Sequence, residues 1–164
     1  MMFNVDVEDA VKEYADMVFR LTMINTKNRP DAEDVFQEVF LRLLKHKNKI
    51  ENQEHLKAWL IRVTIRCCHK HFASSWKKRV KPVSYELLHE NSYEMPSVDD
   101  SVLQLVRQLP ELYRNIIHLF YYEEYSVKEI ASKLDKSESS IKTGLFRARA
   151  LLKDKLQLED DYNE

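Results

Sequence analysis

Residues 126–152, SVKEIASKLDKSESSIKTGLFRARALL, have the pattern of two helices joined by a short turn. Ser126 and Glu129 have the spacing of a capping box, in which each side chain satisfies a backbone amide at the start of a helix. Apolar positions then recur at helical spacing as far as Leu134, and the polar residues 135–137 provide a turn. This stretch predicts a helix-turn-helix, although any helical hairpin would share the spacing.

The second helix of this pattern is predicted to have an apolar and a polar face. At 100° per residue, Ile141, Leu145 and Ala148 point in nearly one direction. The other directions carry hydroxyl, basic and aromatic side chains: Ser137, Ser139, Ser140, Lys142, Thr143, Phe146, Arg147 and Arg149. In a helix-turn-helix the second helix usually enters the major groove of DNA, where hydroxyl and guanidinium groups bind phosphates or base edges. Because residues 126–155 contain eight basic and four acidic side chains, we predict a DNA-binding surface.

Two residues of this helix have more than one interpretation. Phe146 could touch a thymine methyl group or pack partly under the next turn of the chain. Gly144 is the only glycine in the chain, and a glycine costs a helix interior about 1 kcal/mol relative to alanine. It is either a neutral accident or a gap that admits a neighbouring backbone. We favour close packing of Gly144 against the first helix of the motif.

The composition indicates a helical protein without a membrane span. The 164 residues are 44% hydrophobic and 32% charged, with four prolines. No apolar run approaches the roughly 18 residues of a spanning helix, and the acidic N-terminus lacks a signal-peptide pattern. We therefore expect a cytoplasmic protein that is not an integral membrane protein. Its two adjacent cysteines, Cys67 and Cys68, are expected to be reduced thiols.

Helical periodicity also runs through the first half of the chain. Residues 7–25, residues 31–46 and about twenty residues from Leu56 have apolar side chains at steps of three and four. Leu44 is expected beside the apolar stripe of the second helix, and Trp59 on the inner side of the third. Alternating strand patterns do not exceed a few residues, so we predict an all-α fold.

The periodicity fades at residues 80–97, where two prolines occur, and helices are predicted again at 98–108 and 111–122. We expect two small helical domains joined by a flexible linker, with an acidic tail at the end. Their predicted ranges are 1–79 and 98–156 for the domains, 80–97 for the linker and 157–164 for the tail.

Charge is strongly segregated although the net charge is only −1. Residues 62–81 contain seven basic and no acidic side chains, whereas residues 86–100 contain five acidic and no basic ones. The basic run could bind a polyanion, and it would also suit a solvated helix face.

The chain resembles the extracytoplasmic-function (ECF, group IV) sigma factors of bacterial RNA polymerase, which belong to the sigma-70 family. Residues 31–44, DAEDVFQEVFLRLL, and residues 58–66, AWLIRVTIR, look like sigma region 2. Residues 109–156, LPELYRNIIHLFYYEEYSVKEIASKLDKSESSIKTGLFRARALLKDKL, look like sigma region 4. The resemblance implies an alternative sigma factor that binds core RNA polymerase and directs promoter recognition and transcription initiation. It implies no enzymatic activity and no cofactor, and it implies regulation by an anti-sigma factor.

Two other classes of protein share part of this pattern. A stand-alone helix-turn-helix regulator of transcription would share the second domain, but it would not account for residues 31–66. An enzyme built on the Cys-His cluster at residues 67–71 would need a catalytic constellation, and no Ser-His-Asp set, glycine-rich phosphate loop or supported carboxylate pair is evident.

The resemblance assigns site residues one by one. Polymerase binding falls to four residues that helical periodicity places off the buried stripe, on a polar surface: Asp34, Gln37, Glu38 and Leu41. Capture of the minus-ten element as a separated strand falls to basic and aromatic residues: Arg62, Arg66, Lys70, Trp76, Lys77 and Arg79. Recognition of the minus-thirty-five element falls to the eight polar, basic and aromatic residues of the second helix-turn-helix helix.

Three positions depart from the pattern of the family. Arg66 and Lys70 stand where members usually have Asn and commonly have Asp, so the amide that would read a base edge in the minus-ten element is missing. Gly144 stands where related sigma factors often have a basic residue, which predicts the loss of one phosphate contact.

The run CCHKH, residues 67–71, could have a chemical role of its own. Cys67 and His71 share a helical face, but zinc would need two more ligands that no neighbouring residue supplies. Redox sensing by the thiols is a second possibility, and simple packing is the third. We predict packing, and no metal site.

Overall fold

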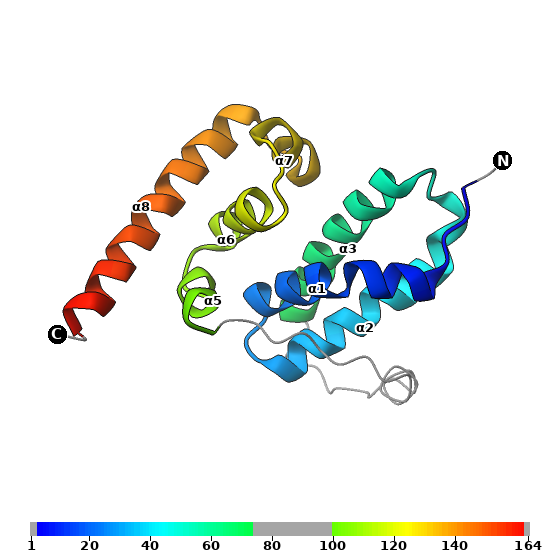
Figure 1. Cartoon of the computed structure of the whole chain (residues 1–164), viewed down its shortest axis with the longest axis horizontal. Helices are drawn as coiled ribbons and strands as arrows, with labels where there is room; N and C mark the ends of the chain where they lie inside the picture. The colour runs from blue at the N-terminus through cyan, green and yellow to red at the C-terminus, as the bar shows by residue number, and fades with distance from the viewer. Residues whose placement is uncertain (1–2, 74–99, 163–164) are drawn as a thin grey trace. The chain divides into compact units, whose positions relative to one another are not determined.

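Figure 1 shows the computed structural model of the chain, which describes residues 3–73 and 100–162. The side chains of residues 72–73, 100–102 and 158–162 are outside this description. Contacts divide the chain into two units, Met1–Ser97 and Val98–Glu164, each built from α-helices. The all-α prediction is confirmed. The expected linker at residues 80–97 and the candidates Trp76, Lys77 and Arg79 lie outside the described residues.

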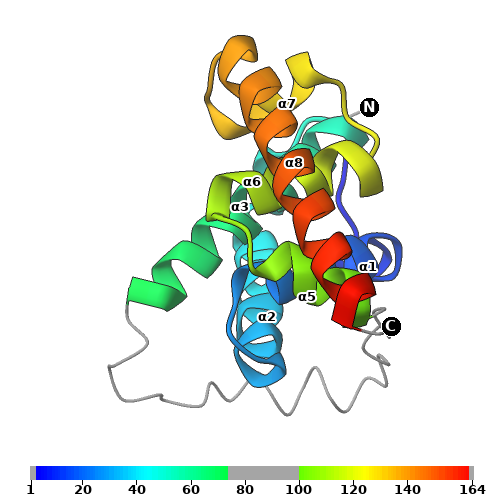
Figure 2. The same ribbon diagram turned by 90° about the vertical axis from the view of Figure 1, so that its left-hand side faces the viewer.

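The described part of the first unit, residues 3–73, contains three long helices that all contact one another. Figures 1 and 2 show them side by side. Their bounds are α1 (Val7–Asn25), α2 (Arg29–His46) and α3 (Gln53–Ala73), with a short 3₁₀ turn η1 (Lys47–Lys49) after α2.

Short polar side chains define where the first two helices begin. Asp6 accepts a hydrogen bond from the Asp9 amide at 3.2 Å, and Asn28 accepts one from the Asp31 amide at 2.9 Å. Pro30 follows in the first turn of α2, where its missing N–H and fixed φ suit a helix start. The second helix therefore begins at Arg29, close to the predicted start.

The core of the first unit is largely apolar, and two of its buried hydroxyl groups are satisfied locally. The rings of Phe19 and Phe36 meet edge to face with centroids 6.2 Å apart. Buried Thr22 and Thr64 donate their hydroxyls to carbonyls in the preceding turn of their own helices, at 2.7 and 2.6 Å. These bonds avoid the cost of burying an unpaired hydroxyl, so threonine is tolerated between apolar neighbours.

Two apolar side chains are less buried than their spacing suggested. Leu44 is 50% exposed, because it stands at the edge of the apolar face of α2. Trp59 is half-buried, and its ring centroid lies 6.1 Å from that of His46.

Cys68 of α3 is as fully buried as Cys67. The buried face of α3 is broad because this helix packs on both α1 and α2.

Over residues 100–162 the second unit contains four helices, one of which ends in a π-helical turn. The helix expected at 98–108 ends at Arg107, the one expected at 111–122 changes from α to π at His118, and the last helix continues well beyond Leu156. Their bounds are α5 (Asp100–Arg107), α6 (Glu111–Ile117) with η2 (His118–Tyr122), α7 (Val127–Leu134) and α8 (Glu138–Tyr162).

The predicted helix-turn-helix is confirmed in α7 and α8. Ser126 and Glu129 form the capping box with two hydrogen bonds, each 3.1 Å long. Asp135 ends α7 in the left-handed conformation at φ 55°, which lets the Lys136 amide return to the Ala131 carbonyl at 2.9 Å. The turn is closed by these local bonds, and α7 packs against the beginning of α8.

Gly144 is buried, and it packs against α6 rather than against α7 as expected. A Cβ atom at this position would lie 2.7 Å from Ile116 Cδ1 and 3.7 Å from Tyr113 Cε1. The gap in α8 therefore admits side chains, not a neighbouring backbone. Because position 144 faces the interior of the unit, a basic residue there would be buried, and the suggestion of a missing phosphate contact is wrong.

Candidate functional site

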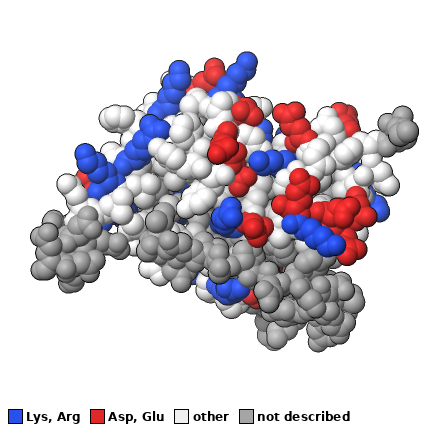
Figure 3. Space-filling view, in the orientation of Figure 1, with Lys and Arg blue, Asp and Glu red and all other residues white. Residues whose placement is uncertain are grey.

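The outer face of α8 has the exposure that the sequence predicted. Ile141, Leu145 and Ala148 are buried, whereas all eight candidate residues from Ser137 to Arg149 are exposed. Phe146 is 75% exposed, which excludes packing under the next turn. Figure 3 shows Lys and Arg side chains along the upper left of the view, over α8. The helix thus presents hydroxyl, basic and aromatic groups on one accessible surface.

Arg149 is held by aromatic residues of α6–η2. Its Nε donates a 2.5 Å hydrogen bond to the Tyr121 hydroxyl. Its guanidinium carbon lies 5.3 Å from the ring centroid of Phe120 and 5.5 Å from that of Tyr121. Cation–π contacts of this kind hold an arginine in one orientation while leaving its other N–H groups available. Tyr121 was missed because it lies 28 residues from Arg149.

Ser137 and Ser140 serve the backbone at the start of α8. The Ser140 amide donates to Ser137 Oγ at 3.1 Å, and the two hydroxyl oxygens are 2.8 Å apart. Ser137 is thus the N-cap of α8. The side chains of the other six candidates, which include Thr143 and Arg147, remain available to contact a binding partner.

The four candidates on α2 share one side of the helix, because they stand at spacings of three and four residues. Glu38 is exposed and accepts a 2.9 Å hydrogen bond from Arg42 Nε, which raises the pKa of Arg42. Asp34 and Leu41 are half-buried. Exposed Leu44 extends this side by one turn and was missed, since its apolar character assigned it to the core.

Gln37 departs from the expectation of a polar, accessible surface. Only 5% of it is exposed, and its side-chain oxygen has no hydrogen-bond partner within the described ranges. Helical rotation places Gln37 far from Val39 on the opposite side of α2, so periodicity could not reveal its burial. A buried amide oxygen without a hydrogen-bond partner is costly to the stability of the fold.

A basic face runs along the exposed side of α3. Arg62, Arg66 and Lys70 follow one another at intervals of four residues, and all three are exposed. Arg62 Nε donates a 3.4 Å hydrogen bond to the Ala58 carbonyl, which keeps its side chain close to the helix. The three cations therefore form one stripe, as the backbone of a nucleic acid strand would require.

The two cysteines are buried thiols. Both are free, and their exposed fractions are 3% for Cys67 and 2% for Cys68. Burial raises the pKa of Cys67, and nearby Arg42 only partly opposes this effect. A protonated thiol is a poor nucleophile and a poor metal ligand, which favours the packing interpretation of both residues.

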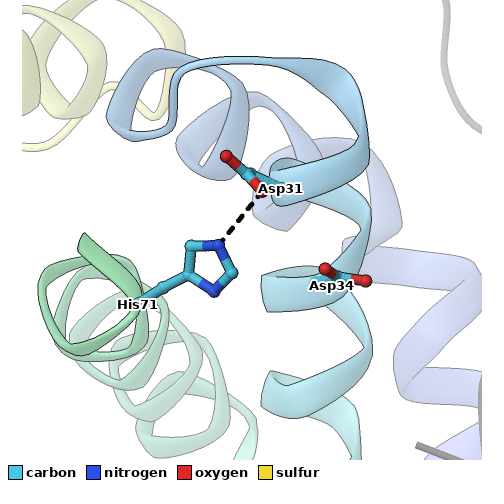
Figure 4. A group of neighbouring side chains, drawn as sticks. All are labelled: Asp31, Asp34 and His71. Atoms are coloured by element: carbon cyan, nitrogen blue, oxygen red, sulfur yellow. Dashed lines mark ion pairs between the residues drawn. The ribbon is translucent and has the colours of Figure 1, made fainter. Parts of the chain in front are cut away.

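His71 pairs with the carboxylate of Asp31. Its Nε2 lies 3.2 Å from Oδ1 of Asp31, which is only 4% exposed. Figure 4 shows His71 pointing from α3 toward α2, where Asp31 and Asp34 stand one turn apart. One potential ligand atom from each of the three residues lies within 4.8 Å of the others. Asp31 was missed as a site residue because forty positions of sequence separate it from His71.

Comparison with known protein families matches both halves of the chain. The model described as Sigma-70 region 2 matches residues 10–78, and the model described as Sigma-70, region 4 matches residues 99–152. The first range includes the surfaces of α2 and α3, and the second includes the helix-turn-helix.

Curated relatives are similar over nearly their full length. The ECF RNA polymerase sigma factor SigM of Bacillus subtilis is 29% identical over 154 residues, which cover 90% of this chain and 93% of SigM. The RNA polymerase sigma factor SigV of the same species is 26% identical over 150 residues, covering 92% of this chain and 90% of SigV.

Solved structures share the fold. The sigma factor RpoE from Bartonella quintana, in complex with the anti-sigma factor NepR, matches with a TM-score of 0.66 at 19% identity, covering 92% of this chain and 96% of RpoE. CnrH, in complex with the cytosolic domain of CnrY, matches with a TM-score of 0.66 at 18% identity, covering 93% of this chain and 88% of CnrH.

Among the described residues, every helix is too short or too polar to cross a lipid bilayer.

Proposed function

Since the chain belongs to the sigma-70 family as an ECF sigma factor, we propose which of its surfaces contact core RNA polymerase and which contact promoter DNA during transcription initiation. It is an alternative sigma factor that binds core RNA polymerase and directs promoter recognition. The observation that carries this function is the presence of both sigma regions in order on one chain. A stand-alone regulator of transcription needs only the helix-turn-helix. That function would not account for the match to sigma region 2.

The side of α2 that carries Asp34, Glu38 and Leu41 is the proposed contact with core polymerase. Glu38 supplies an accessible charge, and Leu41 with exposed Leu44 supplies apolar area beside it. A mixed surface of this kind suits a protein interface, whose centre is apolar and whose rim is charged. Gln37 belongs to the same side of the helix, but its side chain is only 5% exposed and adds little accessible area to the contact.

The basic stripe of α3 is the proposed path of the separated minus-ten strand. Arg62, Arg66 and Lys70 bind phosphates there, in a manner that depends strongly on salt. Trp76, Lys77 and Arg79 extend the proposal beyond the described residues. Arg66 and Lys70 stand where related sigma factors usually have Asn and commonly have Asp. We therefore propose that the promoters of this chain have an atypical minus-ten sequence.

The outer face of α8 is the proposed reader of the minus-thirty-five element. We propose that exposed Arg147 binds a guanine edge in forked fashion and that exposed Phe146 touches a thymine methyl group. Lys142 and Arg149 flank them as phosphate contacts. Arg149 is already oriented by Tyr121, which lowers the entropy lost on binding DNA.

The wider setting follows the family. We propose a cytoplasmic specificity factor without enzymatic activity, with residues 1–79 as the polymerase and minus-ten domain and residues 98–156 as the minus-thirty-five domain. We also propose control by an anti-sigma factor, since a sigma factor that shares the fold is found in a complex with one.

Transcription reconstituted with purified core polymerase tests the function. Template DNA from upstream of the chain's own operon is transcribed with core alone and with core plus the full chain. We expect a discrete transcript only when the chain is present. If the chain binds this DNA tightly by itself and core still cannot start, the protein is a stand-alone regulator.

A further inference from the structure

The cluster of Asp31, Asp34 and His71 lies outside the DNA-binding surfaces and joins two helices of the first unit. Asp31 and Asp34 come from the first turns of α2, and His71 comes from the last turn of α3. The side chain of Asp31 is 6% exposed and that of His71 is 22% exposed. Asp31 is therefore nearly enclosed, whereas solvent can still reach His71. Figure 4 shows the three side chains where the end of α3 faces the beginning of α2.

An ion pair accounts for only part of this arrangement. The 3.2 Å contact joins His71 to Asp31, yet a carboxylate oxygen of Asp34 also lies within 4.8 Å of both ligand atoms. One imidazole nitrogen and one oxygen from each carboxylate are thus close enough for a single divalent cation to contact all three side chains.

We propose that Asp31, Asp34 and His71 bind a divalent transition-metal ion that links α2 to the end of α3. One imidazole nitrogen and two carboxylate oxygens form a ligand set suited to Zn²⁺ and its first-row neighbours, whereas Mg²⁺ and Ca²⁺ prefer oxygen ligands alone. Three protein ligands leave coordination positions for water, which the exposed side of His71 can admit. The buried thiol of Cys67 is not part of the site.

The metal would also affect polymerase binding, a consequence that rests on the proposed function. Asp34 belongs both to the cluster and to the proposed polymerase contact. A bound ion would fix the Asp34 carboxylate toward His71 and neutralise it. Metal binding is measured on the chain alone, so its failure would leave the sigma function untouched, and a failed transcription assay would leave the metal site untouched.

Equilibrium dialysis of the full chain against Zn²⁺, in the presence of excess Mg²⁺, tests the proposal. We expect a single Zn²⁺ ion to bind, and His71→Gln or Asp34→Asn to weaken binding by at least about tenfold. His69→Gln is the matched control, because His69 is exposed and lies two residues earlier on the same helix. Its affinity should equal that of the unchanged chain. Far-ultraviolet circular dichroism verifies that each variant is folded.

Cobalt substitution identifies the ligands independently of affinity. Co²⁺ in this site should give visible d–d bands without a thiolate charge-transfer band, and His71→Gln should remove them. The proposal is overturned if the unchanged chain binds Zn²⁺ no better than His71→Gln, or if a thiolate band appears and Cys67→Ser abolishes it.

Discussion

Gly144 of α8 stands directly over the side chain of Ile116 in α6. A methyl group at position 144 would lie 2.7 Å from Ile116 Cδ1, well inside van der Waals contact, and Ile116 is fully buried. The single glycine of the chain is thus a packing residue of the second unit. Its helix-propensity cost of about 1 kcal/mol is offset by the close approach of α6 to α8.

Gly144→Ala should therefore lower the free energy of unfolding by about 1 kcal/mol, because the strain of overpacking exceeds the gain in helix propensity. Ile116→Val removes the atom that clashes and should cost about 0.5–1.5 kcal/mol by itself. In the double variant the alanine methyl occupies the space of the lost Cδ1. We expect a favourable coupling of about 1–2 kcal/mol in a double-mutant cycle measured by urea denaturation. Additive effects would mean that the two positions do not touch.

Ser126→Ala should destabilise the second unit by about 1 kcal/mol, since it removes one half of the capping box of α7. Ser132→Ala is the control, because Ser132 is exposed in the interior of the same helix. That change should be neutral or slightly stabilising. Far-ultraviolet circular dichroism follows the unfolding, because the two tryptophans, Trp59 and Trp76, both belong to the first unit. Equal effects of both serine changes would argue against a role for the cap.

Arg147→Ala should weaken binding to minus-thirty-five DNA by about 1–3 kcal/mol and relax the base preference at one position, if its guanidinium reads a guanine. Lys153→Ala removes the same charge from an exposed position further along α8. It should reduce binding to all sequences evenly, with a smaller salt slope. Fluorescence anisotropy with promoter and scrambled duplexes distinguishes the two outcomes. Unchanged affinity in Arg147→Ala would remove this residue from the recognition face.

Glu38→Ala should weaken the affinity for core polymerase by about tenfold while leaving DNA binding by the second unit intact. Glu8→Ala is a matched control, because Glu8 and Glu38 are both exposed and each forms a salt bridge with a basic side chain four residues later. Since surface pairs of this kind contribute little to stability, both variants should remain folded. The affinity for core is measured by competition with a labelled chain. A similar loss in both variants would place the polymerase contact elsewhere.

Cys67 and Cys68 should react slowly with a thiol reagent at pH 7 and rapidly after unfolding. The raised pKa of Cys67 means that, at any given pH, less of it is thiolate than in a free cysteine. Reactivity of the folded chain should therefore begin to rise only above the ordinary thiol pKa of about 8.5. Absorbance on reaction with an aromatic disulfide measures both rates. A fast thiol in the folded chain at pH 7 would revive the idea of a redox sensor.

Local signals in the sequence were sufficient for the helices and the motif. Ser126 and Glu129 predicted the start of α7, Asn28 and Pro30 mark the start of α2, and the outward face of α8 follows from its 100° rotation. Each of these features depends on residues within a few positions of one another, so the chain records them in its spacing. The same locality explains why the sequence predicted the exposure of Arg147, whereas it left the exposure of Phe146 open.

Only the tertiary structure decided which side chains of different helices contact one another. Periodicity measures the direction of a side chain but not its neighbour, so it could not pair Gly144 with Ile116 or Arg149 with Tyr121. It also could not bring His71 to Asp31, forty residues away, because only the packing of α3 on α2 closes that distance. By itself, the sequence determined the helices, the two sigma regions and the polar face of α8. Packing between helices decided what the glycine, the histidine and the arginine do.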